Sequence, residues 1–265
     1  MKGILFGGCS FTWGQGLYYY SNLNRVPILD NDYSYHPELM TESHLRFKNS
    51  IRYPRLVANH FNTFEVCKDD SGPLLGNGGS EDETFDFFDG IFESKLFYYD
   101  DFEYIIIQLS HVYRNKFYYV YNNEDQYVIM NPHDKKFQKQ TLTFNDYFIE
   151  NHIDFDSIKN EHLIQQYTRL RKKMLYYEER GIKTKILSWQ DDLLDLIFSD
   201  EFTNSRFIKM EYNNTIVNTI EDLMRLDNNK FRIECDTFFT EKILDNHPSK
   251  YCHEIIAKSI IKNIE

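Results

Sequence analysis

The stretch YIIIQL at residues 104–109 is the clearest strand signal in the chain, an almost continuous run of apolar, mostly β-branched side chains. Apolar residues at successive positions are typical of a strand in a parallel sheet that helices cover on both faces. Shorter strand candidates occur at residues 4–6, 64–67, 185–189 and 231–235. The sequence therefore predicts an α/β fold around a mainly parallel, five-stranded sheet.

Helical patterns fill the segments between these runs. Residues 51–61 carry apolar side chains at helical spacing, and Ser80 opens a capping box for the next helix. Asp156 caps a long helix that Gly181 ends, and Ser249 caps the last helix of the chain. Because strands alternate with helices, we expect a three-layer α/β/α sandwich with a flavodoxin-like layout.

The chain of 265 residues has a length typical of one large domain, with no internal repeat and no obvious linker. Two segments interrupt the alternation of strands and helices. Residues 21–49 are polar and irregular, whereas residues 113–155 are dense in Tyr, Phe, Asn and Asp and predict a small hairpin. We interpret residues 1–265 as a single domain with these two insertions.

The charge balance excludes some classes of partner. Asp and Glu outnumber Lys and Arg by 41 to 30, which gives a net charge of −11. Binding to nucleic acid or to an anionic membrane surface needs a basic stripe, and the sequence has none. No apolar run approaches the roughly 20 residues of a membrane span. The four cysteines are scattered without a C-x-x-C spacing, so we expect reduced thiols and a cytoplasmic protein.

Function in an open parallel sheet gathers at the carboxyl ends of the strands. The segments that follow the five predicted strands carry polar and glycine residues: Gly8-Cys9-Ser10, Gly76-Asn77-Gly78-Gly79-Ser80, Ser110-His111, residues 189–192 and Cys235-Asp236. A serine, glycine amides and histidines that converge in this way form an inventory for a nucleophile and an oxyanion hole.

Near the end of the chain, Asp245 precedes His247 by two residues, just before the last helix. This spacing lets a carboxylate accept a hydrogen bond from one imidazole nitrogen while the other nitrogen faces a serine. Asp236 also follows a predicted strand and competes with Asp245 as the acid. We favour Asp245, since it lies on the same loop as the histidine.

These residues make the chain resemble the SGNH/GDSL hydrolases. Gly8-Cys9-Ser10-Phe11-Thr12-Trp13-Gly14 is similar to the nucleophile block of that family, and Asp245-Asn246-His247-Pro248-Ser249 is similar to its closing acid–histidine block. Asn77-Gly78-Gly79-Ser80 resembles the second block, whose glycine amide lines the oxyanion hole. The family's third block would fall on Gln108-Leu109-Ser110-His111, where its asparagine is replaced by Ser110.

The resemblance implies a serine ester hydrolase with the triad Ser10, His247 and Asp245. Its oxyanion hole would consist of the backbone N–H groups of Ser10 and Gly79, with Ser110 or Asn77 as side-chain donors. The implied substrate is a small-molecule or carbohydrate ester, and no metal or organic cofactor is required.

Several alternatives stay open. His111 and Arg114 follow the third long strand and are candidates for substrate binding. The acids at residues 191–195 allow a metal site, although acids in the first turn of a helix are ordinary dipole partners. The same acyl-enzyme would also serve an O-acyltransferase. Because Ser110 stands in place of the asparagine, a catalytically inactive binding protein on this fold is a further alternative.

Overall fold

The computed structural model describes residues 1–9, 12, 14, 17, 42–67, 80–121, 123–131, 136–138, 155–236 and 242–265. The elements of the main body are the strands β1 (Gly3–Gly7), β2 (Glu65–Cys67), β3 (Phe102–Leu109) and β7 (Lys183–Ser188), and the helices α2 (Glu42–Ile51), α3 (Tyr53–His60), α4 (Glu81–Glu93), α6 (Phe155–Glu178) and α11 (Lys250–Ile264). Short 3-10 helices, η3 (Tyr99–Asp101) and η4 (Val112–Arg114), flank β3.

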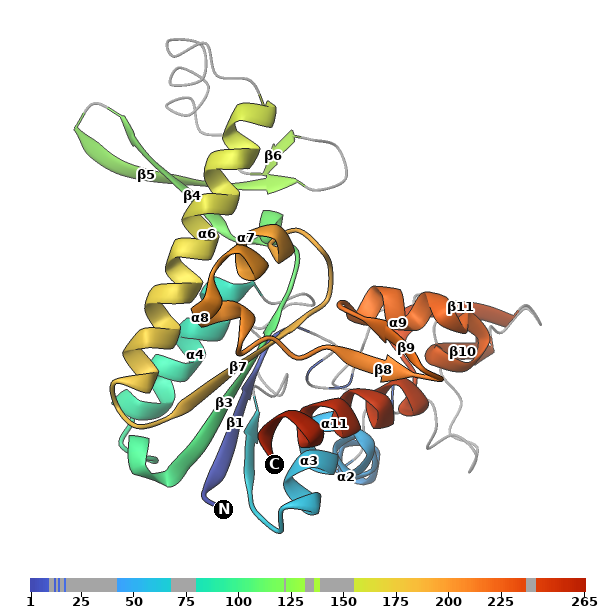
Figure 1. Ribbon diagram of the computed structural model, residues 1–265. Coiled ribbons are helices and arrows are strands. Elements are labelled where there is room, and N and C mark those ends of the chain that lie inside the picture. Colours follow the sequence, from blue (N-terminus) through green and yellow to red (C-terminus); the bar gives the residue numbers. More distant parts are fainter. Residues whose placement is uncertain are drawn as a thin grey trace.

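A parallel sheet with the strand order β2-β1-β3-β7 forms the centre of the molecule (Figure 1). In its register Leu5 lies beside Ile105, and Ile105 lies beside Thr184. The four strands correspond to the first four that the sequence predicts. The predicted α/β class with a parallel sheet is therefore confirmed.

Two separate apolar cores show that both faces of this sheet are covered. Ile4, Phe6 and Ile106 pack with the buried side chains of α3 and α11 on one face. Leu5 and Ile105 pack with those of α4 and α6 on the other face. Successive residues of one strand point to opposite faces, so a strand that is buried throughout feeds both cores. The molecule therefore has three layers, with the sheet between two layers of helices.

Three of the predicted helix boundary signals are confirmed. The hydroxyl of Ser80 accepts a hydrogen bond from the Glu83 N–H at 3.2 Å, and that of Ser249 accepts one from the Cys252 N–H at 3.3 Å. Gly181 has a φ of +86°, which favours glycine, and follows the end of α6.

The fifth predicted strand does not join the parallel sheet of the described residues. It forms β10 (Arg232–Asp236), which pairs antiparallel with β11 (Lys242–Pro248) as a separate hairpin. The edge of β7 is occupied instead by the segment 206–208, since Ile186 exchanges backbone hydrogen bonds of 2.9 and 2.8 Å with it. Apolar and polar residues alternate along Phe231-Arg232-Ile233-Glu234, a pattern typical of a strand covered on one face. The prediction of a five-stranded sheet was wrong on this point.

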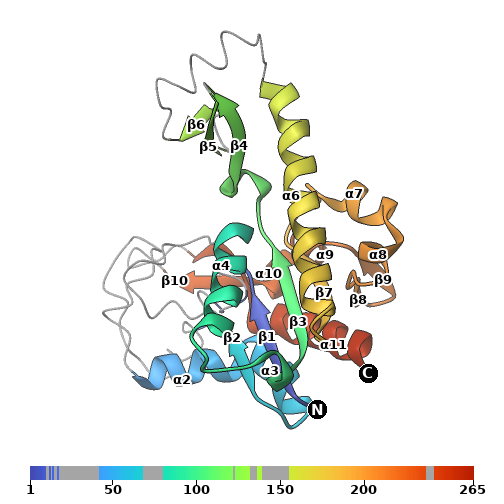
Figure 2. The same cartoon turned by 90° about the vertical axis from the view of Figure 1, so that its left-hand side faces the viewer.

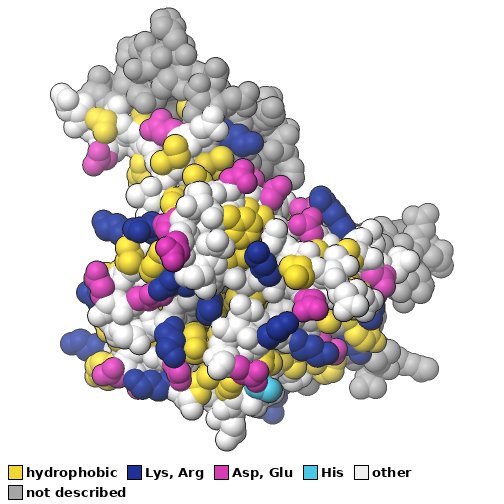
Figure 3. All heavy atoms as spheres, viewed as in Figure 1, with side chains coloured by type: hydrophobic (Ala, Val, Ile, Leu, Met, Phe, Trp, Pro, Cys, Tyr) yellow, Lys and Arg dark blue, Asp and Glu magenta, His cyan; other side chains and the backbone are white. Residues whose placement is uncertain are grey.

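The hairpin predicted within the second insertion is present and larger than expected. Strands β4 (Lys116–Tyr121), β5 (Glu124–Asn131) and β6 (Lys136–Gln138) form an antiparallel sheet that projects from the main body beside the first half of α6 (Figure 2). On the outer side of this sheet Tyr118, Val120 and Tyr127 are exposed, and hydrophobic side chains are visible in this region of the surface (Figure 3).

Residues 42–49 of the first insertion are helical, as part of α2, rather than irregular, while residues 21–41 lie outside the described part of the chain. Between β7 and β10 the chain forms several short elements. The elements are α7 (Leu194–Ser199), α8 (Glu201–Asn204), the hairpin β8 (Met210–Tyr212) and β9 (Thr215–Val217), and then α9 (Ile220–Leu226) and α10 (Asn228–Phe231).

None of the helices formed by the described residues is both long enough and apolar enough to cross a membrane. On the face of the molecule in Figure 3, acidic and basic side chains are interspersed.

Candidate active site

The predicted site lies where β1, β3 and β7 end. Cys9 and Ser110 are buried directly after β1 and β3, and Trp189 follows β7. The backbone N–H of Trp189 donates to the Leu109 carbonyl at 3.0 Å, so the ends of β3 and β7 stay together. The predicted residues Ser10, Asn77 and Gly79 lie outside the described residues.

Gln108 organises the end of β1. Its side-chain oxygen accepts a hydrogen bond from the Thr12 hydroxyl at 2.7 Å, and its amide lies 3.3 Å from the Cys9 sulfur. Gly8 allows this close approach, since a Cβ atom there would lie 2.3 Å from the Thr12 hydroxyl and 2.7 Å from the Gln108 Cβ. The segment that carries the predicted nucleophile is therefore anchored to β3 on both sides of residue 10.

Tyr53 links this segment to the C-terminal helix. Its hydroxyl donates to the Thr12 hydroxyl at 2.9 Å, and its backbone N–H donates to Nδ1 of His253 at 3.1 Å. The two rings stack, with their centroids 5.5 Å apart. The chain of hydrogen bonds Gln108–Thr12–Tyr53–His253 joins the end of β1 to the start of α11.

His253 is fully buried, and this burial lowers the pKa of its imidazole to about 3. The positive charge of Arg52 and the neighbouring His247 lower that pKa further. His253 is thus a neutral, buried imidazole that packs α11 against α3. His247 is half-buried.

The acid–histidine segment lies in a strand rather than in the predicted loop. Residues 245–247 belong to β11, and the register of the hairpin is irregular there. Glu234 pairs with Leu244 and Arg232 pairs with Pro248, so three residues of β11 lie opposite the single residue Ile233. Extra residues in one strand make a bulge, and bulges often re-aim side chains next to active sites.

A second set of polar groups surrounds Ser110. The Ser110 N–H donates to the Glu81 carboxyl at 2.6 Å, and the side-chain amide of Asn115 donates to the other oxygen of that carboxyl. The Asn115 side-chain oxygen in turn accepts a hydrogen bond from the Glu81 N–H at 2.8 Å. Glu81 and Asn115 therefore clamp the start of α4 to the residues that follow β3.

Of the two candidate substrate-binding residues, Arg114 has a hydrogen-bond partner and His111 lies near an acid. Nη1 of Arg114 donates to the Ser110 hydroxyl at 3.2 Å, which leaves that hydroxyl its own proton to donate elsewhere. Nδ1 of His111 lies 3.8 Å from the carboxylate of Asp192, and the Val112 N–H lies 3.3 Å from the same oxygen. His111, Ser110 and Asp192 thus meet where β3 and β7 end.

Burial raises the pKa of the Glu81 carboxyl from 4.5 to about 7, against the opposing effect of the hydrogen bonds from Asn115 and Ser110, and nearby Asp192 raises it further. The folded protein then binds this proton more tightly than the unfolded chain. We expect the free energy of unfolding to fall between about pH 4.5 and pH 7, by on the order of 3 kcal/mol, as this proton is lost.

Urea unfolding across this pH range measures the effect. Glu81→Gln, which has no proton to lose, should abolish this part of the slope, whereas Glu93→Gln at the exposed end of the same helix should keep it. An unchanged slope in Glu81→Gln would show that another group is responsible.

Sequence reasoning missed Gln108, Tyr53 and Glu81 as parts of the site. Glu81 follows a helix cap, where an acid is ordinarily a solvated partner of the helix dipole. The sequence alone does not indicate that Glu81 is buried, because its burial depends on the packing of the residues after β3 against α4. Gln108 could have been identified from the sequence, because a polar residue inside an apolar strand needs a hydrogen-bond partner.

Within the described part of the chain, no group of three or more His, Cys, Asp or Glu side chains is placed to hold a metal ion. No protein-family model, curated protein or solved structure matches this chain.

Proposed function

We propose that this protein is a serine ester hydrolase of the SGNH type. One observation supports the proposal most strongly. The hydrogen-bonded chain from Gln108 through Thr12 and Tyr53 to His253 links Thr12, in the segment that resembles the family's first block, to His253, four residues after the segment that resembles its last block. Ser10 and His247 are more than 230 residues apart in the sequence. A serine nucleophile and its base must nevertheless lie within hydrogen-bond reach of each other in the folded protein.

In the proposed reaction the Ser10 hydroxyl attacks the carbonyl carbon of an ester, and His247 takes its proton. Asp245 holds the imidazole in the productive tautomer and stabilises the imidazolium. The alcohol leaves with the proton from His247, and water then releases the acid from the acyl-enzyme. The bulge in β11 supports the roles of Asp245 and His247, because the residues in the bulge are not held in regular pairing with β10.

Negative charge on the tetrahedral intermediate would be stabilised by the N–H groups of Ser10 and Gly79. Ser110 is a further donor candidate, because Arg114 occupies only an acceptor position of its hydroxyl. The backbone N–H of Ser110 is bound to Glu81 and is not available.

Removal of the Ser110 hydroxyl should be a mild change. Its side chain is shorter than the asparagine of the family, so Ser110→Ala should cost less than the roughly 2.7–4 kcal/mol that removal of an effective donor costs. Turnover of one activated ester by Ser110→Ala, Asn77→Ala and His111→Ala compares the two side-chain donor candidates, Ser110 and Asn77, with the neighbouring His111. A loss in Ser110→Ala as large as that in Ser10→Ala would identify the hydroxyl as a principal donor and contradict this expectation.

The substrate class that we propose is a short acyl ester of a carbohydrate or another small polar alcohol. The test is hydrolysis of acetylated sugars and of p-nitrophenyl acetate, with free acetate as the measured product. Release of acetate supports the hydrolase. If an added sugar acceptor diverts the acetyl group from acetate to the sugar, the protein is an O-acyltransferase, and no turnover of any ester would contradict both activities.

A further inference from the structure

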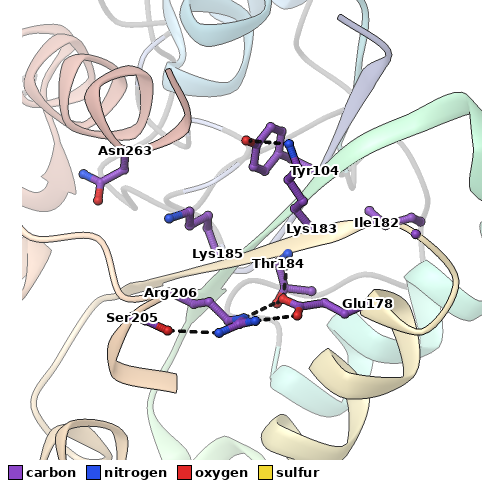
Figure 4. A pocket seen from close by; sticks show the side chains of 10 residues that line it. Tyr104, Glu178, Ile182, Lys183, Thr184, Lys185, Ser205, Arg206 and Asn263 are labelled. Atoms are coloured by element: carbon purple, nitrogen blue, oxygen red, sulfur yellow. Dashed lines mark hydrogen bonds and ion pairs between the residues drawn. The ribbon is translucent and has the colours of Figure 1, made fainter. Parts of the chain in front are cut away.

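A cavity of about 380 Å³ opens near the amino-terminal ends of β3 and β7, at the opposite end of the sheet from the candidate active site. It is lined by the residues shown in Figure 4: Tyr104, Glu178, Gly181, Ile182, Lys183, Thr184, Lys185, Ser205, Arg206 and Asn263. Its volume is at the lower end of the range for small-molecule sites. The lining comes from β3, β7, the end of α6, the segment after α8 and the end of α11.

Three of the lining side chains are cations, whereas only Glu178 is an acid. Glu178 is fully engaged: Nε and Nη2 of Arg206 donate to its two oxygens, each at 2.6 Å, and the Thr184 hydroxyl donates to it at 2.6 Å. Lys183 lies 3.3 Å from the Glu103 carboxylate and 3.4 Å from the Tyr104 hydroxyl. Two of the three cations therefore have acidic partners.

The third cation is Lys185, and it forms no hydrogen bond or ion pair with any residue in the described part of the chain. Figure 4 shows its side chain extending from β7 toward Asn263 of α11. Burial lowers the pKa of the Lys185 ammonium, and the charge of Arg206 lowers it further. The cavity thus holds a half-buried ammonium group that has no hydrogen-bond or ion-pair partner among the described residues, and the carboxylate of Glu178, which is paired with Arg206, offsets its charge only in part.

The remaining polar groups around Lys185 do not supply an anion. The side-chain amide of Asn263 donates to the Ser259 carbonyl at 2.8 Å, so its oxygen remains as a neutral acceptor. The Ile264 carbonyl at the end of α11 accepts a hydrogen bond from the Tyr104 hydroxyl at 3.2 Å. A negatively charged ligand would complete this set, since an ammonium group pairs with an oxyanion through strong, charge-assisted hydrogen bonds.

We propose that this cavity binds a small ligand through an oxyanion, a carboxylate or a phosphate group, with Lys185 as its principal partner. The ammonium group of Lys183 lies on the same side of β7, two residues away, and is the second cation within reach. Arg206 contributes to the positive potential but keeps its bidentate pair with Glu178. This site is independent of the proposed esterase activity.

The test is a titration of the full-length protein with sodium phosphate and, separately, with sodium acetate, at an ionic strength held constant with sodium chloride. Amide ¹⁵N–¹H shifts of Thr184, Lys185 and Arg206 report on the cavity. We expect at least one of the two anions to give saturable shifts at these residues with a millimolar Kd, and the tighter of the two identifies the ligand group.

Lys185→Gln should weaken this binding by about tenfold or more, as expected when a charge-assisted hydrogen bond is lost. Lys185→Arg should retain it. Lys209→Gln, the same change on a nearby exposed lysine outside the cavity, should leave it unchanged. Ester hydrolysis by Lys185→Gln should equal that of the wild type. A failure of the proposed anion site can therefore be distinguished from a failure of the proposed esterase activity. No saturable shift with either anion, or wild-type affinity in Lys185→Gln, would overturn the proposal.

Discussion

Ser10→Ala should lower the rate of hydrolysis of a small activated ester by about 10³ or more, while the free energy of unfolding stays within about 0.5 kcal/mol of the wild type. The hydroxyl oxygen is the atom that forms the acyl bond in the proposed mechanism, and alanine has no substitute for it. His247→Ala should cause a loss of similar size, because members of a catalytic triad act as a unit.

Two conservative changes elsewhere serve as controls. Ser199→Ala removes an exposed hydroxyl that donates to the Leu196 carbonyl at 2.9 Å. His60→Ala removes an exposed imidazole that lies 3.0 Å from the Glu265 carboxylate. Both variants should keep the wild-type turnover. If Ser10→Ala also kept it, the assignment of the nucleophile would be wrong.

Asp245→Asn should lower turnover by up to about 10⁴, because an asparagine stabilises the wrong tautomer of the catalytic imidazole and cannot stabilise the imidazolium. The measurement is kcat/KM for the same ester. A pH profile adds a second readout, since loss of the acid should change the apparent pKa of the catalytic base, whereas a merely structural defect should not.

Asp236→Asn is the matched comparison, since Asp236 is the competing acid. In the β10–β11 hairpin Asp236 pairs with Lys242, whereas Ile233 lies opposite the bulge that contains His247. Three residues along a strand span about 10 Å, so Asp236 is remote from the histidine along the hairpin. We therefore expect Asp236→Asn to be mild. A severe loss in Asp236→Asn together with a mild one in Asp245→Asn would reverse the assignment.

The parts of the fold that depend on local sequence signals were predictable. The run at 104–109 forms β3 because successive apolar residues suit a strand with two covered faces, and Ser80 and Ser249 cap helices through contacts within one turn. Such signals need no knowledge of which elements become neighbours.

The strand at Arg232–Asp236 was assigned to the wrong sheet because its partner is set by tertiary structure. A short strand signal by itself fits a parallel sheet or a hairpin, and the edge of β7 is already bridged by the segment at 206–208. The bulge at residues 245–247 follows from that pairing, so it could not be predicted while the segment was interpreted as a loop.

The candidate site was predictable in its residue types but not in its supporting contacts. Ser110 and His111 do follow a strand that ends beside β1, as parallel alignment requires. The clamp from Glu81 to Ser110 and the link from Tyr53 to His253 join residues 29 and 200 positions apart, and neither spacing forms a recognisable pattern.

The most direct test of the proposed function is covalent labelling with a fluorophosphonate, which reacts with a serine that a neighbouring base activates. Peptide mapping of the labelled wild-type protein should find one modified residue, Ser10, and the His247→Ala variant should remain unlabelled under the same conditions. An unlabelled wild-type protein, or a label on another residue with none on Ser10, would contradict the assignment of Ser10 as the catalytic nucleophile.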